Sequence, residues 1–369
     1  SEDTAFTTVG EAEDAGCEQR LVYAQDWEIV TPQSSQDLRT GRALIVADSK
    51  DGDALRAARS VFARVESSAH ASTDSLDCVV FGVGLTASDD PDEIEGNVHR
   101  LFALLSRFGD GQALIVVLTK NAFSTKGGRP NLSGAALWGA CESARLEMRR
   151  GSRLVCVDVD VPGPLMLEAP FAHPQEFGLL VNVSRNVVRA KRIVPCGEHV
   201  HGASFRWPAS PARGTVLVTG GTGALGLALR FILLSRSGVF NAEDEELLEA
   251  CMQVVKCDVS DEGSLQSACA EYHGTIVGAI HAAGVLCDAT LKNVSPDQIS
   301  QVMGPKVRGA INLTRLLQDE PVEFCWLFSS VTALMGNAGQ SVYGAANAVL
   351  DSIARFGGPE YLSIQWGPW

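Results

Sequence analysis

The sequence predicts an α/β fold with a largely parallel sheet. Short runs rich in β-branched residues, each of the length of a buried strand, lie at residues 42–48, 77–83, 113–119 and 153–160. Between them, residues 94–108 and 136–150 carry apolar side chains at helical spacing. Strands that alternate with helices along the chain pair in parallel, because each helix returns the chain to the same end of the sheet.

A second series of strands and helices follows a segment rich in Pro and Ser. Its predicted strands lie at residues 215–221, 231–237, 252–260, 274–284, 323–331 and 361–369. We place the domain boundary within residues 209–214, which gives one unit over residues 21–211 and another over residues 212–369. Residues 1–20 are acidic and poor in large apolar side chains, so they are expected to form a linker or tail.

The composition is that of a globular protein, with 369 residues of which 46% are hydrophobic and 20% charged. A formal net charge of −14 argues against binding to nucleic acids or membrane surfaces. The ten cysteines form no CxxC pair and lie mostly in apolar runs, which indicates buried reduced thiols and no metal site. No apolar run reaches the ~18 residues of a membrane span and no signal peptide is recognisable, so we expect a cytoplasmic location.

A glycine-rich segment follows the predicted strand TVLV and opens an apolar stretch. Its candidate cofactor-binding residues are Thr219, Gly220, Gly221, Thr222, Gly223, Ala224, Leu225 and Gly226. Glycines at such a turn let the backbone approach a pyrophosphate, whose charge then lies at a helix N-terminus. The next predicted strand ends in Ser235 and Arg236, which suit the 2′-phosphate of NADP better than an acidic residue would. The segment therefore predicts an NADP site.

The segment after this loop is shorter than a nucleotide-binding fold requires. Four residues separate Gly226 from Phe231, where the next predicted strand begins. A crossover between parallel strands needs a helix of about ten residues or more at this point. Either the crossover helix is missing from this chain or the sequence lacks the residues that form it; residues 355–358 make a similarly abrupt join.

Four polar residues in the second half form a candidate catalytic set. Ser330 ends a buried strand, and Tyr343 begins a helical stretch thirteen residues later. Asn347 lies four residues after Tyr343 and therefore on the same helix face. A phenol is a weak acid near neutral pH unless a cation lowers its pKa from about 10. Lys306 is the last lysine in the sequence, which makes it the leading candidate for that cation.

These motifs resemble the ketoreductase domain of type I polyketide synthases and multidomain fatty acid synthases, a branch of the short-chain dehydrogenases. The similar segments are TGGTGALG, LLSRSG, CDVS, HAAGVLCDATL, PKVRGAINL, FSSVTALMGNAGQSVYGAANAVLD and SIQWGPW. Most short-chain dehydrogenases carry Tyr-x-x-x-Lys, whereas this sequence has Tyr-x-x-x-Asn with its lysine upstream, an exchange typical of that branch. The segments YAQDWEIV, GAALWGACESARLE and VVRAKRIVP resemble the family's structural subdomain. The resemblance implies two Rossmann-like subdomains, a truncated structural one and a catalytic, NADP-binding one.

The resemblance further implies an NADPH-dependent reduction of a carrier-bound β-ketoacyl thioester to the β-hydroxyacyl thioester. Tyr343 would give a proton to the developing alkoxide, and Ser330 would bond to the same oxygen. Lys306 would stabilise the tyrosinate and hold the cofactor ribose, and Asn347 would support a proton relay. Besides Lys306 and Tyr343, the implied cofactor contacts are Cys257, Asp258, Val259, His281, Ala282, Ala283 and Gly284. The implied partners are an acyl carrier protein and neighbouring synthase domains.

The resemblance also implies a marker of stereochemistry. In this family an Asp in a Leu-Asp-Asp motif marks reductases that give the D (3R) β-hydroxy product. A Trp eight residues before the catalytic Tyr marks the opposite class. Here the motif reads Leu286-Cys287-Asp288, and Met335 holds the Trp position. Asp288 therefore predicts a B-type reductase with a D product, although Cys287 departs from the motif.

Two alternatives remain open at this point. A short-chain epimerase or dehydratase acting on nucleotide sugars would be expected to carry Tyr-x-x-x-Lys, which Asn347 argues against. A reductase-inactive domain, kept for scaffolding or for binding an acyl carrier, is disfavoured by the intact set of polar residues. The short segment after Gly226 nevertheless leaves it open.

Overall fold

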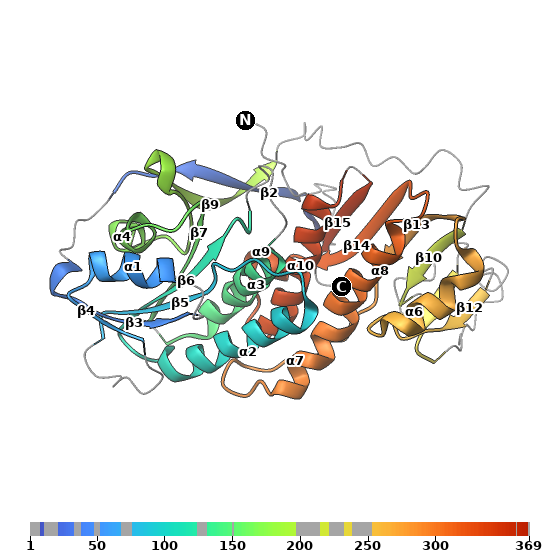
Figure 1. Cartoon of the computed structure of the whole chain (residues 1–369), viewed down its shortest axis with the longest axis horizontal. Coiled ribbons are helices and arrows are strands. Elements are labelled where there is room, and N and C mark those ends of the chain that lie inside the picture. The colour runs from blue at the N-terminus through green and yellow to red at the C-terminus, as the bar shows by residue number, and fades with distance from the viewer. Residues whose placement is uncertain are drawn as a thin grey trace, which may run out of the picture.

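The computed structural model shows the chain as one mixed sheet with helices packed against it (Figure 1). The described residues are 8–10, 21–32, 38–47, 52–67, 76–123, 131–149, 151–196, 215–220, 232–237, 253–358 and 360–367. Among them, the strands follow the order β12-β11-β10-β13-β14-β15-β1-β2-β9-β8-β7-β6-β5-β3-β4. The two halves of the chain supply the two ends of this sheet, which confirms the predicted α/β class.

All described strands of the second half pair in parallel. They are β10 (Thr215–Thr219), β11 (Ile232–Ser235), β12 (Gln253–Lys256), β13 (Ile276–His281), β14 (Phe324–Ser330) and β15 (Tyr361–Trp366). Each lies within one of the predicted apolar runs. Their order is that of a dinucleotide-binding Rossmann sheet, in which the ligand lies where the strand order reverses. Here that reversal falls between β10 and β13.

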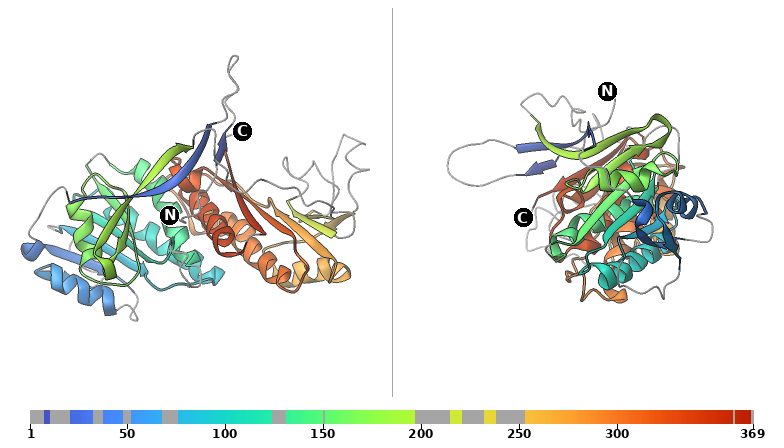
Figure 2. Two further views of the ribbon diagram at one scale, coloured as in Figure 1. Left: turned by 90° about the horizontal axis from the view of Figure 1, so that it is seen from above. Right: turned by 90° about the vertical axis from the view of Figure 1, so that its left-hand side faces the viewer.

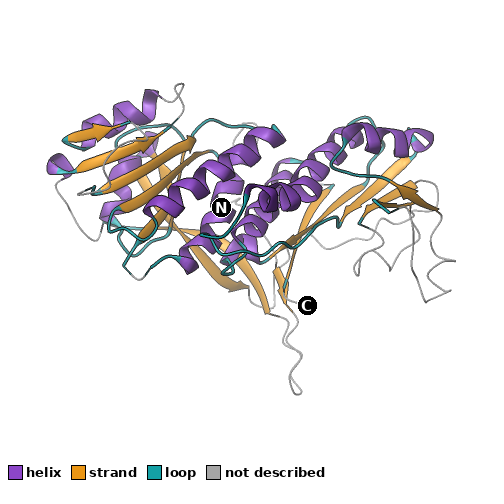
Figure 3. Cartoon of the chain, turned by 90° about the horizontal axis from the view of Figure 1, so that it is seen from below, coloured by secondary structure: helices purple, strands orange, loops and turns teal. Residues whose placement is uncertain are grey.

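Helices line one face of the sheet across both halves of the molecule (Figure 3). Those described in the second half are α6 (Glu262–Cys269), η5 (Ala270–Tyr272), α7 (Pro296–Met303), η6 (Gly304–Arg308), α8 (Gly309–Leu317), α9 (Thr332–Met335) and α10 (Ser341–Phe356). Helix α10 contains the stretch predicted as helical after Tyr343. Its buried face, which includes Val349 and Leu350, belongs to one core with Leu327 of β14.

The first half is a three-layer α/β unit. Its parallel strands are β3 (Arg42–Val46), β4 (Arg64–Glu66), β5 (Cys78–Gly84), β6 (Leu114–Lys120), β7 (Arg153–Val159) and β8 (Gly178–Asn182). Strand β5 is buried along its whole length, which explains why it is apolar throughout. Its alternate residues face different cores, Val79 and Phe81 one core, Cys78 and Val80 the other.

Helices cover both faces of this unit. On one face lie α2 (Pro91–Phe108) and α3 (Leu132–Glu147). On the other lie α1 (Gly52–Val61) and α4 (Leu165–Ala172), while short turns η1 (Leu38–Thr40) and η2 (Val183–Arg185) complete the described helices here. Asp90 caps α2 by accepting hydrogen bonds from two backbone N–H groups of its first turn. The helices predicted at residues 94–108 and 136–150 are thus confirmed, and both begin earlier than predicted.

Three strands join the two halves, β1 (Thr8–Gly10), β2 (Leu21–Ile29) and β9 (Val187–Cys196). Strand β1 pairs in parallel with β15 and in antiparallel fashion with β2, which in turn pairs with β9 (Figure 2). Residues 8–10, which form β1, lie within the segment predicted as a linker or tail over residues 1–20. Pairing of their backbone groups on both sides, and not apolar content, gives that strand its place.

A close contact between two helices brings the halves together. Helices α3 and α10 cross where Gly139 faces Gly344, and a Cβ atom added to Gly139 would lie 2.3 Å from the carbonyl oxygen of Gly344. Only glycine leaves room for such an approach. One hydrophobic core consequently runs through both halves, with members on α2, α3, α7, α8 and α10.

Several predictions from the sequence lie outside the described residues. These are the domain boundary at residues 209–214, the glycine-rich residues 221–226 and the short crossover to Phe231. Within the described part of the chain, no helix is long and apolar enough to cross a membrane. Cys78, Cys141, Cys156, Cys257, Cys269 and Cys325 are free and buried, and Cys287 is free and half-buried.

Candidate active site

The predicted site residues gather at the carboxyl ends of the second-half strands, which together form one edge of the sheet. Thr219, Ser235, His281 and Ser330 are the last residues of β10, β11, β13 and β14, which run in the same direction. Gly220 continues from Thr219 with φ +67°, and a Cβ there would lie 2.9 Å from the backbone of Ala283. This turn requires glycine, because the backbones that follow β10 and β13 nearly touch.

Lys306 lies in η6, a π-helical turn that joins α7 to α8. Pro305 precedes it, has no N–H group to continue the α-helical ladder, and would clash with the carbonyl one turn back. The helix accommodates the proline by widening, and the N–H of Gly309 bonds to the carbonyl of Gly304. Such widened turns recur at functional sites, and this one carries the buried lysine.

The amine of Lys306 is the centre of the candidate catalytic set. Its Nζ donates to the carbonyl oxygen of Phe328 at 2.8 Å and to Oδ1 of Asn347 at 2.7 Å. The same Nζ lies 5.2 Å from the centroid of the Tyr343 ring. Asn347 is fixed in turn, because its Nδ2 donates to the carbonyl oxygen of Tyr343 at 2.9 Å. The structure thus brings together Lys306, Tyr343 and Asn347, which lie on two elements far apart in the sequence.

Burial governs the charges in this set. Desolvation lowers the pKa of Lys306 to about 7, although the carboxylate of Asp351 acts in the opposite direction. Desolvation also raises the pKa of Tyr343, against the effect of Asn347. Burial is thus the largest influence of the protein's own groups on the pKa of Tyr343. Tyr343 keeps its proton near neutral pH, the form that a proton donor needs.

The ring of His281 lies between Thr219 and the backbone of Lys306. Its ring is fully buried, its Nδ1 lies 2.7 Å from Oγ1 of Thr219, and its Nε2 lies 3.0 Å from the carbonyl oxygen of Lys306. Burial lowers the pKa of His281 to about 4, so the ring is neutral. Both ring nitrogens have protein partners, which leaves only the backbone of His281 for the predicted cofactor contact.

Ser330 begins a chain of polar contacts toward the predicted stereochemical marker. Its Oγ accepts from the N–H of Thr332 at 3.2 Å and lies 3.1 Å from that residue's hydroxyl. The Thr332 hydroxyl donates to Oε1 of Gln340 at 3.4 Å, and Nε2 of Gln340 donates to Oδ2 of Asp288 at 2.9 Å. Asp288 is exposed, as is Met335 at the family's Trp position.

The remaining predicted cofactor residues lie around the same edge. Arg236 is exposed just after β11, and Ser235 is buried with its Oγ 3.0 Å from Oγ of Ser237. Asp258 is exposed between two buried residues, Cys257 and Val259. Ala282, Ala283 and Gly284 follow β13, and a Cβ on Gly284 would lie 2.9 Å from Cε of Lys306. Residues 221–226, also predicted to bind the cofactor, are outside the described part.

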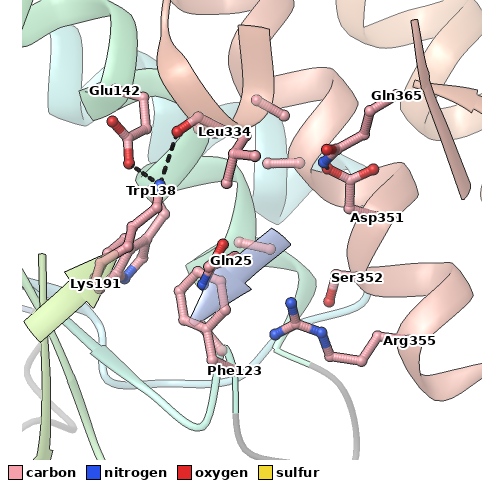
Figure 4. Close-up of a pocket in the computed structure, with 15 residues that line it drawn as sticks. Gln25, Phe123, Trp138, Glu142, Lys191, Leu334, Asp351, Ser352, Arg355 and Gln365 are labelled. Atoms are coloured by element: carbon pink, nitrogen blue, oxygen red, sulfur yellow. Dashed lines mark hydrogen bonds and ion pairs between the residues drawn. The ribbon is translucent and has the colours of Figure 1, made fainter. Parts of the chain in front are cut away.

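Sequence reasoning missed a buried carboxylate behind the site. Asp351 lies one turn after Asn347, with Oδ1 and Oδ2 accepting from Oγ of Ser363 at 2.5 Å and from Nε2 of Gln365 at 2.6 Å. It lines a cavity between the halves, facing Glu142 and Lys191 of the first half (Figure 4). The spacing from Tyr343 to Asn347 to Asp351, four residues each, was a signal that could have revealed it.

A Rossmann sheet with buried Lys306 and Asn347 beside half-buried Tyr343, and with a glycine turn after β10, is typical of nicotinamide-dependent reductases of the short-chain dehydrogenase type. The sequence profile of the KR domain family matches residues 214–369. That of the Rossmann fold domain of the polyketide synthase extender module SpnB matches residues 25–188. The chain belongs to the ketoreductase domains of polyketide synthases, whose members bind a nicotinamide cofactor.

Relatives and solved structures agree with this membership. The chain is 35% identical over 283 residues to chalcone synthase cfoA of Aspergillus candidus, covering 69% of this chain and 10% of the relative. It is 33% identical over 302 residues to polyketide synthase GfsE of Streptomyces halstedii, covering 76% of this chain and 8% of the relative. The first ketoreductase of the tylosin polyketide synthase superposes with a TM-score of 0.68 at 27% identity, covering 94% of this chain and 82% of the other. The chain thus spans about a tenth of the curated relatives, which are multidomain synthases.

Proposed function

We propose that this chain reduces a β-ketoacyl thioester to the β-hydroxyacyl thioester with NADPH. The observation that carries the proposal is the position of the Lys306 amine, held between Phe328 and Asn347 and beside the Tyr343 ring. A buried amine and a protonated phenol at a Rossmann edge are suited to protonating a carbonyl oxygen during its reduction. A nucleotide-sugar epimerase finds no comparable support, because Asn347 occupies the lysine position of that class.

The described residues at the carboxyl ends of the second-half strands are suited to bind a nicotinamide dinucleotide. Gly220 lets the backbone pass within reach of a pyrophosphate, and Arg236 offers an exposed cation for a 2′-phosphate. Lys306 is the group suited to hold the nicotinamide ribose. When bound, the cofactor supplies the hydride that reduces the carbonyl carbon.

The chain's own residues would supply the proton and orient the ketone. Tyr343 gives its proton to the ketone oxygen as negative charge develops there, and Ser330 hydrogen-bonds to the same oxygen. Lys306 stabilises the tyrosinate that results, and Asn347 holds Lys306 in place through the 2.7 Å contact. The family's place within longer synthases supports a carrier-bound substrate and neighbouring synthase domains as partners. A cytoplasmic location belongs to the same proposal.

Cofactor preference tests the proposal directly. We expect turnover of a β-ketoacyl thioester with NADPH to exceed that with NADH, and Arg236→Asp to lower the NADPH:NADH ratio of kcat/KM by about 10-fold or more, the scale of one lost charge-assisted hydrogen bond. Arg149→Asp, an exposed arginine of the first half, is the control and should leave the ratio unchanged. A chain that binds NADPH but shows no turnover would instead be the inactive scaffolding domain.

Asp288 supports a B-type assignment, with a D (3R) product. The exposed carboxylate ends the polar contacts that start at Ser330, and from this position it would steer the entering acyl arm toward one face of the site. Chiral chromatography of the product is the measurement, and we expect a predominantly D alcohol. A predominantly L product from the wild-type chain would show that Asp288 does not act as the family's marker here.

A further inference from the structure

Glu147, the last residue of helix α3 in the first half, contacts two loops of the second half. Its Oε2 accepts from the backbone N–H of Leu291 at 2.6 Å. Its Oε1 accepts from the backbone N–H of Gly339 at 2.8 Å and from the hydroxyl of Ser341 at 3.4 Å. A single carboxylate therefore holds the loop that contains Asp288 and the turn that opens helix α10.

The position of this carboxylate is unfavourable for the helix that carries it. The C-terminal end of a helix has a partial negative charge, so a basic or neutral residue is preferred there. Leu291 is buried and Glu147 is half-buried, so the contact is partly shielded from water. The acidic residue does not stabilise its own helix in this position, and its hydrogen bonds to the two loops provide a physical reason for its presence.

The two loops also contact each other beside Glu147. The N–H of Ala289 donates to the carbonyl oxygen of Gly339 at 2.9 Å, and the side chain of Gln340 bonds to Asp288 at 2.9 Å. Gln340, at the N-terminus of α10, has no side-chain capping bond to the helix. The contacts to Gly339 and Ser341 therefore hold the start of α10 in place. Ser341 lies two residues before Tyr343.

Neighbouring residues of the first half hold the same segment. Oγ of Ser143 accepts from the N–H of Asn337 at 3.0 Å, and Nζ of Lys191 donates to the carbonyl oxygen of Leu334 at 2.8 Å. A Cβ on Gly336 would lie 2.2 Å from the carbonyl oxygen of Glu142, so this turn lies directly on α3. Helix α3 thus supports the segment from Gly336 to Ser341, and among its described side-chain hydrogen bonds those of Glu147 also reach the loop of Asp288.

We propose that Glu147 is a positioning residue that sets the separation between the Asp288 loop and Tyr343, and thereby the pose in which the ketone meets its proton donor. The proposal rests on the proposed reductase function. It assigns to the first half a direct influence on substrate orientation, in addition to its packing against the second half.

Glu147→Gln is the test. A glutamine keeps the size of the side chain but has only one acceptor oxygen, so one of the two loops loses its partner and faces an amide N–H₂ instead. We expect kcat/KM for the thioester to fall by about 10-fold or more, the D:L product ratio to fall, and the dissociation constant of NADPH to stay within about twofold of the wild-type value. Amide hydrogen exchange at Leu291 or Gly339 should become faster.

Glu168→Gln, an exposed glutamate on α4, is the matched control and should change none of these quantities. Wild-type exchange rates and an unchanged product ratio in Glu147→Gln would overturn the proposal. Equal losses for the thioester and for NADPH binding would also overturn it, because they indicate general loosening of the fold. A wild-type chain without reductase activity would refute the proposed function instead, and exchange at the two amides would still report whether Glu147 holds the loops.

Discussion

Tyr343→Phe is expected to lower turnover of a β-ketoacyl thioester by ~10² or more, the usual scale for loss of a general acid. The substitution removes the hydroxyl while keeping the ring against which Lys306 lies. Because burial raises the pKa of Tyr343, the hydroxyl is protonated at neutral pH and available to the ketone. The contacts of Lys306 with Phe328 and Asn347 do not involve this hydroxyl, so NADPH binding should persist.

Tyr361→Phe is the matched control. Tyr361 packs against the same core but begins β15, at the edge of the sheet opposite the candidate site. Steady-state kinetics and NADPH titration of both variants would separate loss of chemistry from loss of binding. Near wild-type turnover of Tyr343→Phe would place the proton donor elsewhere and remove the main support for the catalytic set.

The core strands could be predicted from the sequence because their residues are buried on both faces. Strands β5, β6 and β10 consist almost entirely of buried residues, most of them apolar, so each is a distinct run in the sequence. Strands β2 and β9 were not predicted, because most of their described residues are half-buried or exposed and do not form a continuous buried apolar run. What fixes them is pairing with each other along their whole length, a tertiary property that local composition does not record.

The residues of the candidate site likewise divide into those that the sequence predicted and those that only the fold brings together. Ser330, Tyr343 and Asn347 are close in the sequence, and their spacing predicted them. Lys306 was predicted because it is the last lysine, and the structure brings its amine to Asn347. Glu147 lies almost two hundred residues from Gly339, so no local pattern relates the two. The buried position of His281, with both ring nitrogens engaged, likewise arises only when β10 and η6 meet around it.

The contact between α3 and α10 gives the second large expected effect. Gly139→Val should lower the free energy of unfolding by ~3 kcal/mol or more, the upper end of overpacking costs. The added Cβ would lie 2.3 Å from the carbonyl oxygen of Gly344 and 2.6 Å from Cβ of Ala348. These atoms belong to the helix backbone and to a short side chain, which cannot rotate away. The two helices would have to separate to relieve this clash. Because Gly344 directly follows Tyr343, turnover should fall together with stability.

Gly96→Val is the control, because it makes the same substitution within helix α2 where an added Cβ meets nothing within 4 Å. Both variants replace a helical glycine with a β-branched residue, so their intrinsic helix propensities change alike. Thermal unfolding and thioester turnover should therefore differ between them only through the α3–α10 contact. If Gly139→Val unfolds at the same temperature as Gly96→Val, the two helices do not pack as closely as the structure has them, and the halves are less tightly joined than their shared core indicates.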